Sequence, residues 1–169
     1  MFGKSKQADW KIEPLGAHHD RSEFRCGVPE LDAYLQQQAG QDQKRKLAAI
    51  FVLVNRQVVG GYYTLSAHSI LATDLPEDMA RKLPRFPLPV TLLGRMAVAE
   101  SRHGSGLGKS LLVDALQRAF LGSRQVASWA VIVDAKIEAR NFYLKYGFIP
   151  LPNRPSRLFL PMKTIEKIF

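Results

Sequence analysis

The fold is decided by the stretch VTLLGRMAVAESRHGSGLGKS, residues 90–110. Its first nine residues are mostly apolar and predict a buried strand. A glycine-rich loop follows at residues 102–109. A helix begins near Gly106 or Leu107, because apolar residues then recur at helical spacing: Leu107, Leu111, Leu112, Ala115, Leu116, Ala119 and Phe120. The stretch therefore predicts a strand, a loop and a helix in that order.

The loop between this strand and this helix is suited to binding phosphate. Such a turn gathers several backbone N–H groups at the helix N-terminus, where the positive end of the helix dipole also lies. Its glycines allow a ligand to approach the backbone because they carry no Cβ atom. A turn that only connects two elements is the structural alternative, and we favour the phosphate site.

Three phosphate-binding motifs compete for the loop. A Walker A motif ending in Gly108-Lys109-Ser110 needs a glycine where His103 stands. The dinucleotide motif G-x-G-x-x-G needs its third glycine where Lys109 stands. The remaining pattern is R-x-x-G-x-G, which we assign to the segment Arg102-His103-Gly104-Ser105-Gly106-Leu107.

This third pattern resembles the acyl-coenzyme A pyrophosphate loop of the GCN5-related N-acetyltransferases (GNAT). The resemblance implies an α/β fold with a central mixed, twisted sheet flanked by helices. It also implies that acetyl-CoA is a co-substrate, and we expect no metal. The residues expected to bind the coenzyme through this strand and loop are Ala97, Val98, Arg102, His103, Gly104, Ser105, Gly106, Leu107, Gly108 and Lys109.

A second motif is ARNFYLKYGF, residues 139–148. Apolar and aromatic residues three and four positions apart predict a helix, and Gly147 supplies a left-handed stop. We expect Phe142 and Phe148 to be core residues. The motif resembles the A-x-x-F-Y-x-x-x-G-F signature of acetyltransferases. That resemblance implies that Tyr143 is catalytic at the coenzyme sulfur and that Asn141 binds the coenzyme.

The rest of the chain predicts alternating strands and helices, hence a mixed α/β sheet within a single domain, residues 1–169. A hairpin is expected at residues 55–57. The expected strands are residues 9–15, 47–54, 58–70, 90–98, 126–133 and 157–162. The expected helices, besides the one after the loop, are residues 29–46, 75–83 and 136–146.

The chain is strongly basic, with 24 Lys and Arg against 15 Asp and Glu, a net charge of +9. Such an excess favours a polyanionic partner, although any single basic cluster can equally be a solvated face. No apolar run is long enough to span a bilayer, and the first nine residues lack a secretory signal. The single cysteine, Cys26, excludes an internal disulfide and is best interpreted as a small buried hydrophobe. We expect a cytoplasmic protein that does not bind membranes.

The reaction that the GNAT resemblance implies can be checked against ordinary pKa values. A phenol near pKa 10 can protonate a departing thiolate near pKa 8.5. We find no obvious general base, and we interpret Glu100 as a surface or capping residue. An α-amine near pKa 7.7–8.0 is partly neutral already, whereas a lysine amine near 10.4 is not. The missing base therefore favours an α-amine acceptor.

The N-terminal half resembles one GNAT branch, the toxin acetyltransferases of bacterial type II toxin–antitoxin systems. The matching segments are FRCG (24–27), LDAYL (31–35), IFV (50–52), GYYTLS (61–66) and PVTLLGRMAV (89–98). The branch implies acetylation of the α-amine of aminoacyl-tRNA, which blocks translation. It implies a ribbon-helix-helix antitoxin that contacts operator DNA, and frequent homodimers. The residues expected to contact tRNA phosphates are Lys44, Arg45, Lys46, Arg81, Lys82 and Arg85.

Three alternatives stay open. The acceptor can be a small amine or a protein N-terminus, in which case the basic surface is incidental. The second alternative is a nucleotide-binding module, which the segment Gly108-Lys109-Ser110 leaves possible. The third is a non-catalytic RNA-binding domain on the same scaffold. Arg95, within an apolar strand, is best interpreted as part of an ion pair, and Trp10 and Trp129 as core residues.

Overall fold

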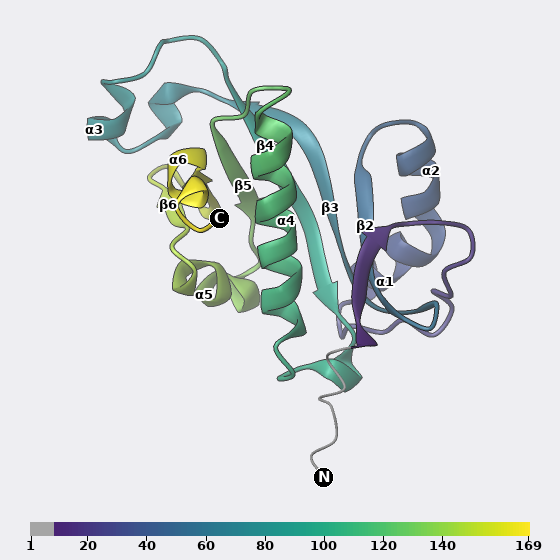
Figure 1. Ribbon diagram of the computed structural model, residues 1–169. Coiled ribbons are helices and arrows are strands. Elements are labelled where there is room, and N and C mark those ends of the chain that lie inside the picture. Colours follow the sequence, from purple (N-terminus) through teal and green to yellow (C-terminus); the bar gives the residue numbers. More distant parts are fainter. Residues whose placement is uncertain (1–8) are drawn as a thin grey trace. The chain divides into compact units, whose positions relative to one another are not determined.

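The computed structural model describes residues 9–169 (Figure 1). Within this range, seven strands form one mixed sheet in the order β1-β2-β3-β4-β5-β7-β6. The pair β4/β5 is parallel, whereas β1/β2, β2/β3, β5/β7 and β6/β7 are antiparallel. The strands are β1 (Lys11–Pro14), β2 (Ala49–Asn55), β3 (Val58–Ile70), β4 (Leu88–Val98), β5 (Ala130–Asp134), β6 (Ile149–Leu151) and β7 (Arg154–Pro161). The mixed α/β sheet predicted from the sequence is confirmed.

The chain divides into two compact units. The first comprises the residues up to Leu65 together with Arg95–Ala115, and the second comprises Ser66–Gly94 together with Leu116–Phe169. None of the helices in residues 9–169 combines the length and the apolar character that crossing a membrane requires.

In the first unit, the predicted hairpin joins β2 to β3. Asn55 pairs with Val58, so Arg56 and Gln57 form a two-residue turn. Both turn residues lie in the left-handed region, with φ of 49° and 73°, as a type I′ turn requires. The twist of the two strands therefore selects this turn although neither residue is a glycine or an asparagine.

The helix expected at residues 29–46 is interrupted by a wider turn. The segment consists of α1 (Pro29–Ala33), a π-helical turn η2 (Tyr34–Gln38) and α2 (Ala39–Lys44), and Figure 1 shows α1 and α2 beside β1 and β2. Pro29 occupies the first helical turn, as predicted. Leu35 and Ala39 are fully buried in a core with Ile50, Val52 and Tyr62.

The helix after the glycine loop is α4 (Leu107–Ser123), and it starts where the sequence predicts. Its predicted apolar stripe is buried: Leu107, Leu111, Leu112, Ala115, Leu116 and Ala119. Phe120 is half-buried and stacks on Phe169, with ring centroids 6.5 Å apart.

In the second unit, β5 is a central strand with neighbours on both edges, β4 and β7. Its residues Ala130, Val131, Ile132 and Val133 are all buried, which explains a continuous apolar run instead of an alternating one. Around this sheet lie α3 (Glu77–Ala80), α5 (Ile137–Lys145) and α6 (Met162–Glu166).

Several predicted boundaries in this unit are wrong. The strand expected from residue 126 begins at Ala130, because the amide of Val126 still bonds to the carbonyl of Gly122 at the end of α4. The helix expected at residues 75–83 is reduced to α3 and is preceded by a 3₁₀ turn, η3 (Ala72–Asp74). The short strand β6 and the helix α6 were not predicted.

Candidate functional site

The loop after β4 contains backbone N–H groups that have no acceptor. It opens with a 3₁₀ turn, η4 (Glu100–Arg102). The amides of Arg102, His103 and Ser105 donate within the loop, at N···O distances of 2.9, 3.1 and 3.3 Å. In the described part of the chain, the amides of Gly104, Gly106, Leu107, Gly108 and Lys109 make no hydrogen bond to a backbone carbonyl. Three of these amides belong to the first turn of α4, where backbone N–H groups can bind an anion; phosphate binding by this loop stays a prediction.

Two glycines hold this loop in a conformation that other residues rarely adopt. Gly104 has φ of +78° and Gly106 has φ of +83°. A Cβ atom built on Gly104 meets no heavy atom within 4 Å. The space beside Gly104 is therefore open to a ligand.

The number of residues between Arg102 and the glycines corrects the assignment of the R-x-x-G-x-G motif to this loop. Arg102 stands two positions before Gly104, which is the spacing R-x-G-x-G, so the assignment to Arg102–Leu107 was one residue out of register. The spacing R-x-x-G-x-G is met when His103 takes the first position and Gly106 and Gly108 are the two glycines. This register places the glycines on either side of Leu107, the first residue of α4.

Side chains brace the loop from within the first unit. The imidazole Nε2 of His103 lies 2.7 Å from the carbonyl oxygen of Val98 and forms a hydrogen bond with it. The hydroxyl of Ser105 donates to the carbonyl of Arg102. The guanidinium of Arg102 lies over the ring of Trp10, 5.5 Å from its centroid. The side chains of Arg102 and His103 are thus occupied within the protein, which leaves the backbone to face a ligand.

Ala97 and Val98 lie in the last part of β4, beyond its pairing with β5. The parallel register ends where Leu93 pairs with Val133, five residues before β4 itself ends at Val98. The role of the Ala97 and Val98 amides in binding the pantetheine arm stays a prediction.

In the second unit, Tyr143 occupies the buried side of α5. Its side chain is 7% exposed, and its ring packs edge-on against Phe142 and Phe148 at centroid distances of 5.3 and 5.4 Å. Burial raises the pKa of the Tyr143 phenol well above its ordinary value. The phenol therefore stays protonated at neutral pH.

The Tyr143 hydroxyl differs from most other tyrosine hydroxyls in the chain. Those of Tyr34, Tyr62 and Tyr63 are hydrogen-bonded to Asp42, the Leu31 carbonyl and Asp114, respectively. In residues 9–169, the Tyr143 hydroxyl has no hydrogen-bond partner. The ring is buried, and no hydrogen bond within the described residues occupies the hydroxyl.

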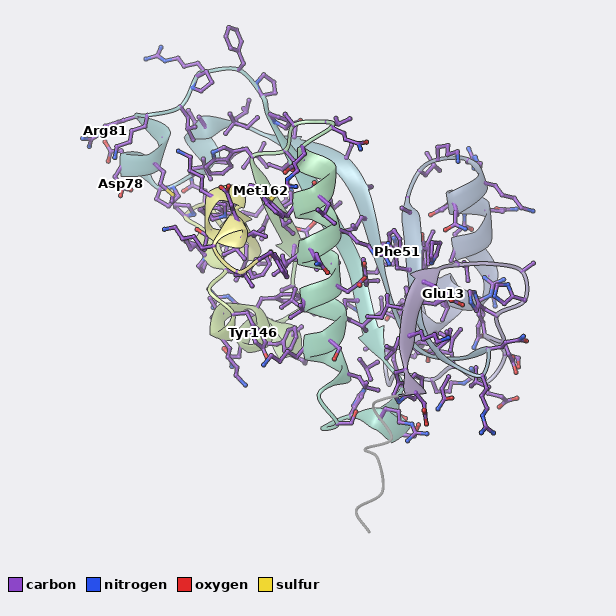
Figure 2. All side chains as sticks on the ribbon, in the orientation of Figure 1. Glu13, Phe51, Asp78, Arg81, Tyr146 and Met162 are labelled. Carbon is purple, nitrogen blue, oxygen red and sulfur yellow. The ribbon has the colours of Figure 1, made fainter. Side chains whose placement is uncertain are left out.

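The rest of the second motif matches its prediction in part. Asn141 is exposed on α5, and Figure 2 labels Tyr146, which directly follows this helix. Gly147 has φ of +92° and ends the helix, as predicted. Phe148 is buried, whereas Phe142 is only half-buried, so its assignment to the core was too strong.

The predicted phosphate-binding residues form two separate basic clusters. Lys44, Arg45 and Lys46 are exposed at the end of α2, in the first unit. Arg81, Lys82 and Arg85 are exposed directly after α3, in the second unit. Arg81 extends from α3 (Figure 2) and lies 3.2 Å from Glu77, a pair so exposed that it contributes little to stability.

Arg95 makes a contact that the sequence does not predict. Its guanidinium lies over the ring of Tyr34, with the guanidinium carbon 3.6 Å from the ring centroid, which is a cation–π interaction. The Tyr34 hydroxyl in turn donates to Asp42 at 2.9 Å. Hydrogen bonds from Gln38 and Tyr34, together with the charge of Arg95, lower the pKa of Asp42. The ion pair expected for Arg95 is therefore replaced by a cation–π contact with Tyr34.

Other chemistry-bearing side chains have structural explanations. Burial raises the pKa of the Cys26 thiol to about 11, so this cysteine is no nucleophile, as predicted. Glu13, His18 and His19, which form no recognisable motif in the sequence, lie close enough together to hold a metal. His19 Nδ1 accepts a hydrogen bond from the Gly16 amide, so its Nε2 carries the proton and donates to Glu13 at 2.6 Å. A metal at that nitrogen would displace this hydrogen bond.

The comparisons with known proteins agree with this geometry. A family model described as an acetyltransferase (GNAT) domain matches residues 46–150. The tRNA-acetylating toxin of Mycobacterium tuberculosis (strain ATCC 25618 / H37Rv) is 36% identical over 145 residues, which cover 85% of this chain and 87% of that protein.

Two solved structures are similar over nearly the whole chain. AtaT complexed with acetyl-methionyl-tRNAfMet has a TM-score of 0.89 and 31% identity, covering 95% of this chain and 99% of that one. A tyrosine-to-phenylalanine mutant of AtaT bound to acetyl-CoA and the C-terminus of the antitoxin AtaR has a TM-score of 0.84 and 28% identity, covering 95% and 98%.

The chain belongs to the GNAT acetyltransferase family. It is an N-acetyltransferase whose co-substrate is acetyl-CoA, and its mixed sheet has the GNAT fold expected from the sequence.

Proposed function

We propose that this protein is a toxin that acetylates the α-amine of the amino acid on aminoacyl-tRNA and so blocks translation. The observation that carries the proposal is the group of amides of Gly104 and Gly106–Lys109, which make no backbone hydrogen bond and lie beside open space at Gly104, an arrangement that suits the pyrophosphate of a coenzyme. The similarity to a tRNA-acetylating toxin and to a toxin in complex with acetyl-methionyl-tRNA supports the acceptor.

Each step of acetyl transfer can be assigned to residues of this chain. Acetyl-CoA supplies the activated thioester. The amides of residues 104–109 would hold its pyrophosphate, the backbone of Ala97 and Val98 its pantetheine arm, and Asn141 a further polar group of the coenzyme. When the new C–N bond forms and the C–S bond breaks, Tyr143 would give its proton to the departing sulfur. The proton released by the attacking amine then restores the balance through solvent.

The pH dependence of the reaction follows from these groups. An α-amine near pKa 7.7–8.0 becomes a nucleophile as the pH rises, whereas Tyr143 stays protonated because burial raises its pKa. We expect kcat/KM for aminoacyl-tRNA to increase from pH 6 to about pH 8 and then to level off up to pH 9. A profile that falls again below pH 9 would show that a different acid protonates the sulfur.

The basic cluster of the first unit provides a test of tRNA binding. Replacing Lys44, Arg45 and Lys46 together by glutamate is expected to weaken tRNA binding. The slope of log affinity against log salt should fall by roughly 0.7–0.9 for each phosphate that the variant no longer neutralises. Coenzyme affinity should not change. A variant with Arg124, Lys163 and Lys167 reversed is the matched control, since these exposed cations give the same change in net charge. Equal weakening by both variants would indicate a general charge effect.

The acceptor is tested by transfer of labelled acetyl from acetyl-CoA to a pool of aminoacylated tRNAs, with uncharged tRNA beside it. Label on charged tRNA alone would support the proposal and identify the preferred amino acid. Label on small amines or a protein N-terminus instead would favour the first alternative. RNA binding without any transfer would favour the non-catalytic module, and magnesium-dependent ATP binding the nucleotide-binding one.

The proposal extends to partners and location. We place the protein in the cytoplasm, where charged tRNA is found. The complex of a related toxin with the C-terminus of its antitoxin supports a cognate antitoxin. We propose that this antitoxin is a ribbon-helix-helix protein, that operator DNA is contacted only through it, and that the enzyme is a homodimer.

A further inference from the structure

Phe86 is an exposed aromatic residue in a loop that is otherwise well fixed. Its side chain is 74% exposed, whereas Leu88, two residues later, is 5% exposed and belongs to the core of the second unit. On the other side, Leu83 packs partly against the same core. Pro84 and Pro87 restrict the backbone between these two points. The loop thus holds Phe86 in solvent, although Leu88 is buried and Leu83 is partly buried.

The surroundings of Phe86 are basic. Arg81, Lys82 and Arg85 are all exposed and lie within five residues of it along the chain. Two exposed acidic residues, Glu77 and Asp78, precede these cations in α3; Glu77 lies 3.2 Å from Arg81, and both of these side chains are more than 70% exposed. Residues 79–88, which follow these two carboxylates, carry three cations and no acidic residue, and they display one apolar ring among those cations.

A ring among cations is the chemistry that single-stranded nucleic acid requires. Cations track the phosphates, while an aromatic side chain stacks on an unpaired base whatever its sequence. A protein partner would instead favour a contiguous apolar surface, and the residues flanking Phe86 are an arginine and a proline. An aminoacyl-tRNA carries its amino acid on an unpaired 3′ end, so this acceptor offers bases of the right kind.

We infer that Phe86 is a stacking platform for an unpaired base at the 3′ end of the aminoacyl-tRNA, with Arg81, Lys82 and Arg85 binding the adjacent phosphates. This inference rests on the proposed function and names the residue that reads the single-stranded part of that substrate. The surface formed by Phe86 and the second basic cluster then differs from residues 44–46, because Phe86 contributes binding affinity that salt does not screen.

The test compares Phe86→Ala with Phe86→Tyr in binding of a purified aminoacyl-tRNA over a series of salt concentrations. Phe86→Ala is expected to weaken binding about tenfold without changing the salt slope, and Phe86→Tyr to bind like the unmodified protein. Arg85→Gln should instead reduce the slope. Val126→Ala is the matched control, because Val126 is 79% exposed elsewhere in the same unit.

Two further measurements make the outcome decisive. A tRNA trimmed of its unpaired 3′ nucleotides should bind Phe86→Ala and the unmodified protein equally. In Phe86→Trp, the added fluorescence should be quenched by intact tRNA and not by trimmed tRNA. Phe86→Ala affinity within twofold of the unmodified protein, or quenching by trimmed tRNA, would overturn the inference, as would a defect confined to antitoxin binding. If the unmodified protein binds tRNA but transfers no acetyl group, the proposed function fails separately.

Discussion

Tyr143→Phe is expected to lose acetyl transfer while keeping its fold and its affinity for acetyl-CoA. The ring of Tyr143 fills a buried position between Phe142 and Phe148, and phenylalanine fills the same volume. The hydroxyl has no partner in residues 9–169, so its removal leaves no buried group there unpaired. The variant should therefore be as stable as the unmodified protein, and only its chemistry should change.

The size of the loss follows from the role of the proton. General acid catalysis typically contributes 10²- to 10⁴-fold, so kcat should fall by roughly that factor. The measurement is single-turnover acetyl transfer together with coenzyme binding by calorimetry. Tyr146→Phe, directly after the end of α5, is the matched control and should retain full activity. Unchanged kcat in Tyr143→Phe would remove this residue from the mechanism.

The second large effect is expected at Gly104. Its φ of +78° is strained for any residue with a Cβ atom, and most of all for a β-branched one. Gly104→Val should therefore distort the loop and place methyl groups in the open space where a coenzyme would lie. We expect the affinity for acetyl-CoA to fall at least tenfold, measured by calorimetry, with the thermal transition only slightly lowered.

Gly122 provides the matched control for this change. It lies near the end of α4, and a Cβ atom there also meets nothing within 4 Å. Because its backbone is helical, Gly122→Ala should stabilise the protein by up to about 1 kcal/mol and leave coenzyme affinity unchanged. Normal coenzyme affinity in Gly104→Val would show that the loop does not bind the pyrophosphate.

The sequence predicts those parts of the fold in which local signals and packing agree. The start of α4 at Leu107 follows from the change from glycines to an apolar helical stripe, and β5 follows from its continuous apolar run. The hairpin at Arg56 and Gln57 follows from the polar break between two apolar runs. In each case the same residues determine the local conformation and the burial.

The differences lie where a neighbour in space decides the structure. The strand β6 has three residues, one of them a proline, and exists only through its pairing with β7. Arg95 looked like half of an ion pair because sequence spacing cannot show that the ring of Tyr34, far away in the chain, lies against it.

The sequence located the loop of the candidate site correctly, but it did not predict the exact motif register. The amides of Gly104 and Gly106–Lys109 make no backbone hydrogen bond, although the motif register was one residue off. The exposed Phe86 carries no sequence signal, since an aromatic residue beside Leu83 and Leu88 would ordinarily be counted with the core. A single N-acetyltransferase domain spanning residues 1–169, and the roles of the individual site residues, stay predictions.

The π-helical turn at Tyr34–Gln38 determines which deletions the N-terminal helical segment can absorb. Such a turn holds one residue more than a regular α-helical turn. Losing one residue there would restore ordinary winding and leave Pro29–Ala33 and Ala39–Lys44 facing as they do now. The same loss within Ala39–Lys44 would rotate everything after it by about 100° and move Asp42 away from the Tyr34 hydroxyl. If homologues differ in the length of this helical segment, the difference should therefore fall within the π-helical turn, Tyr34–Gln38.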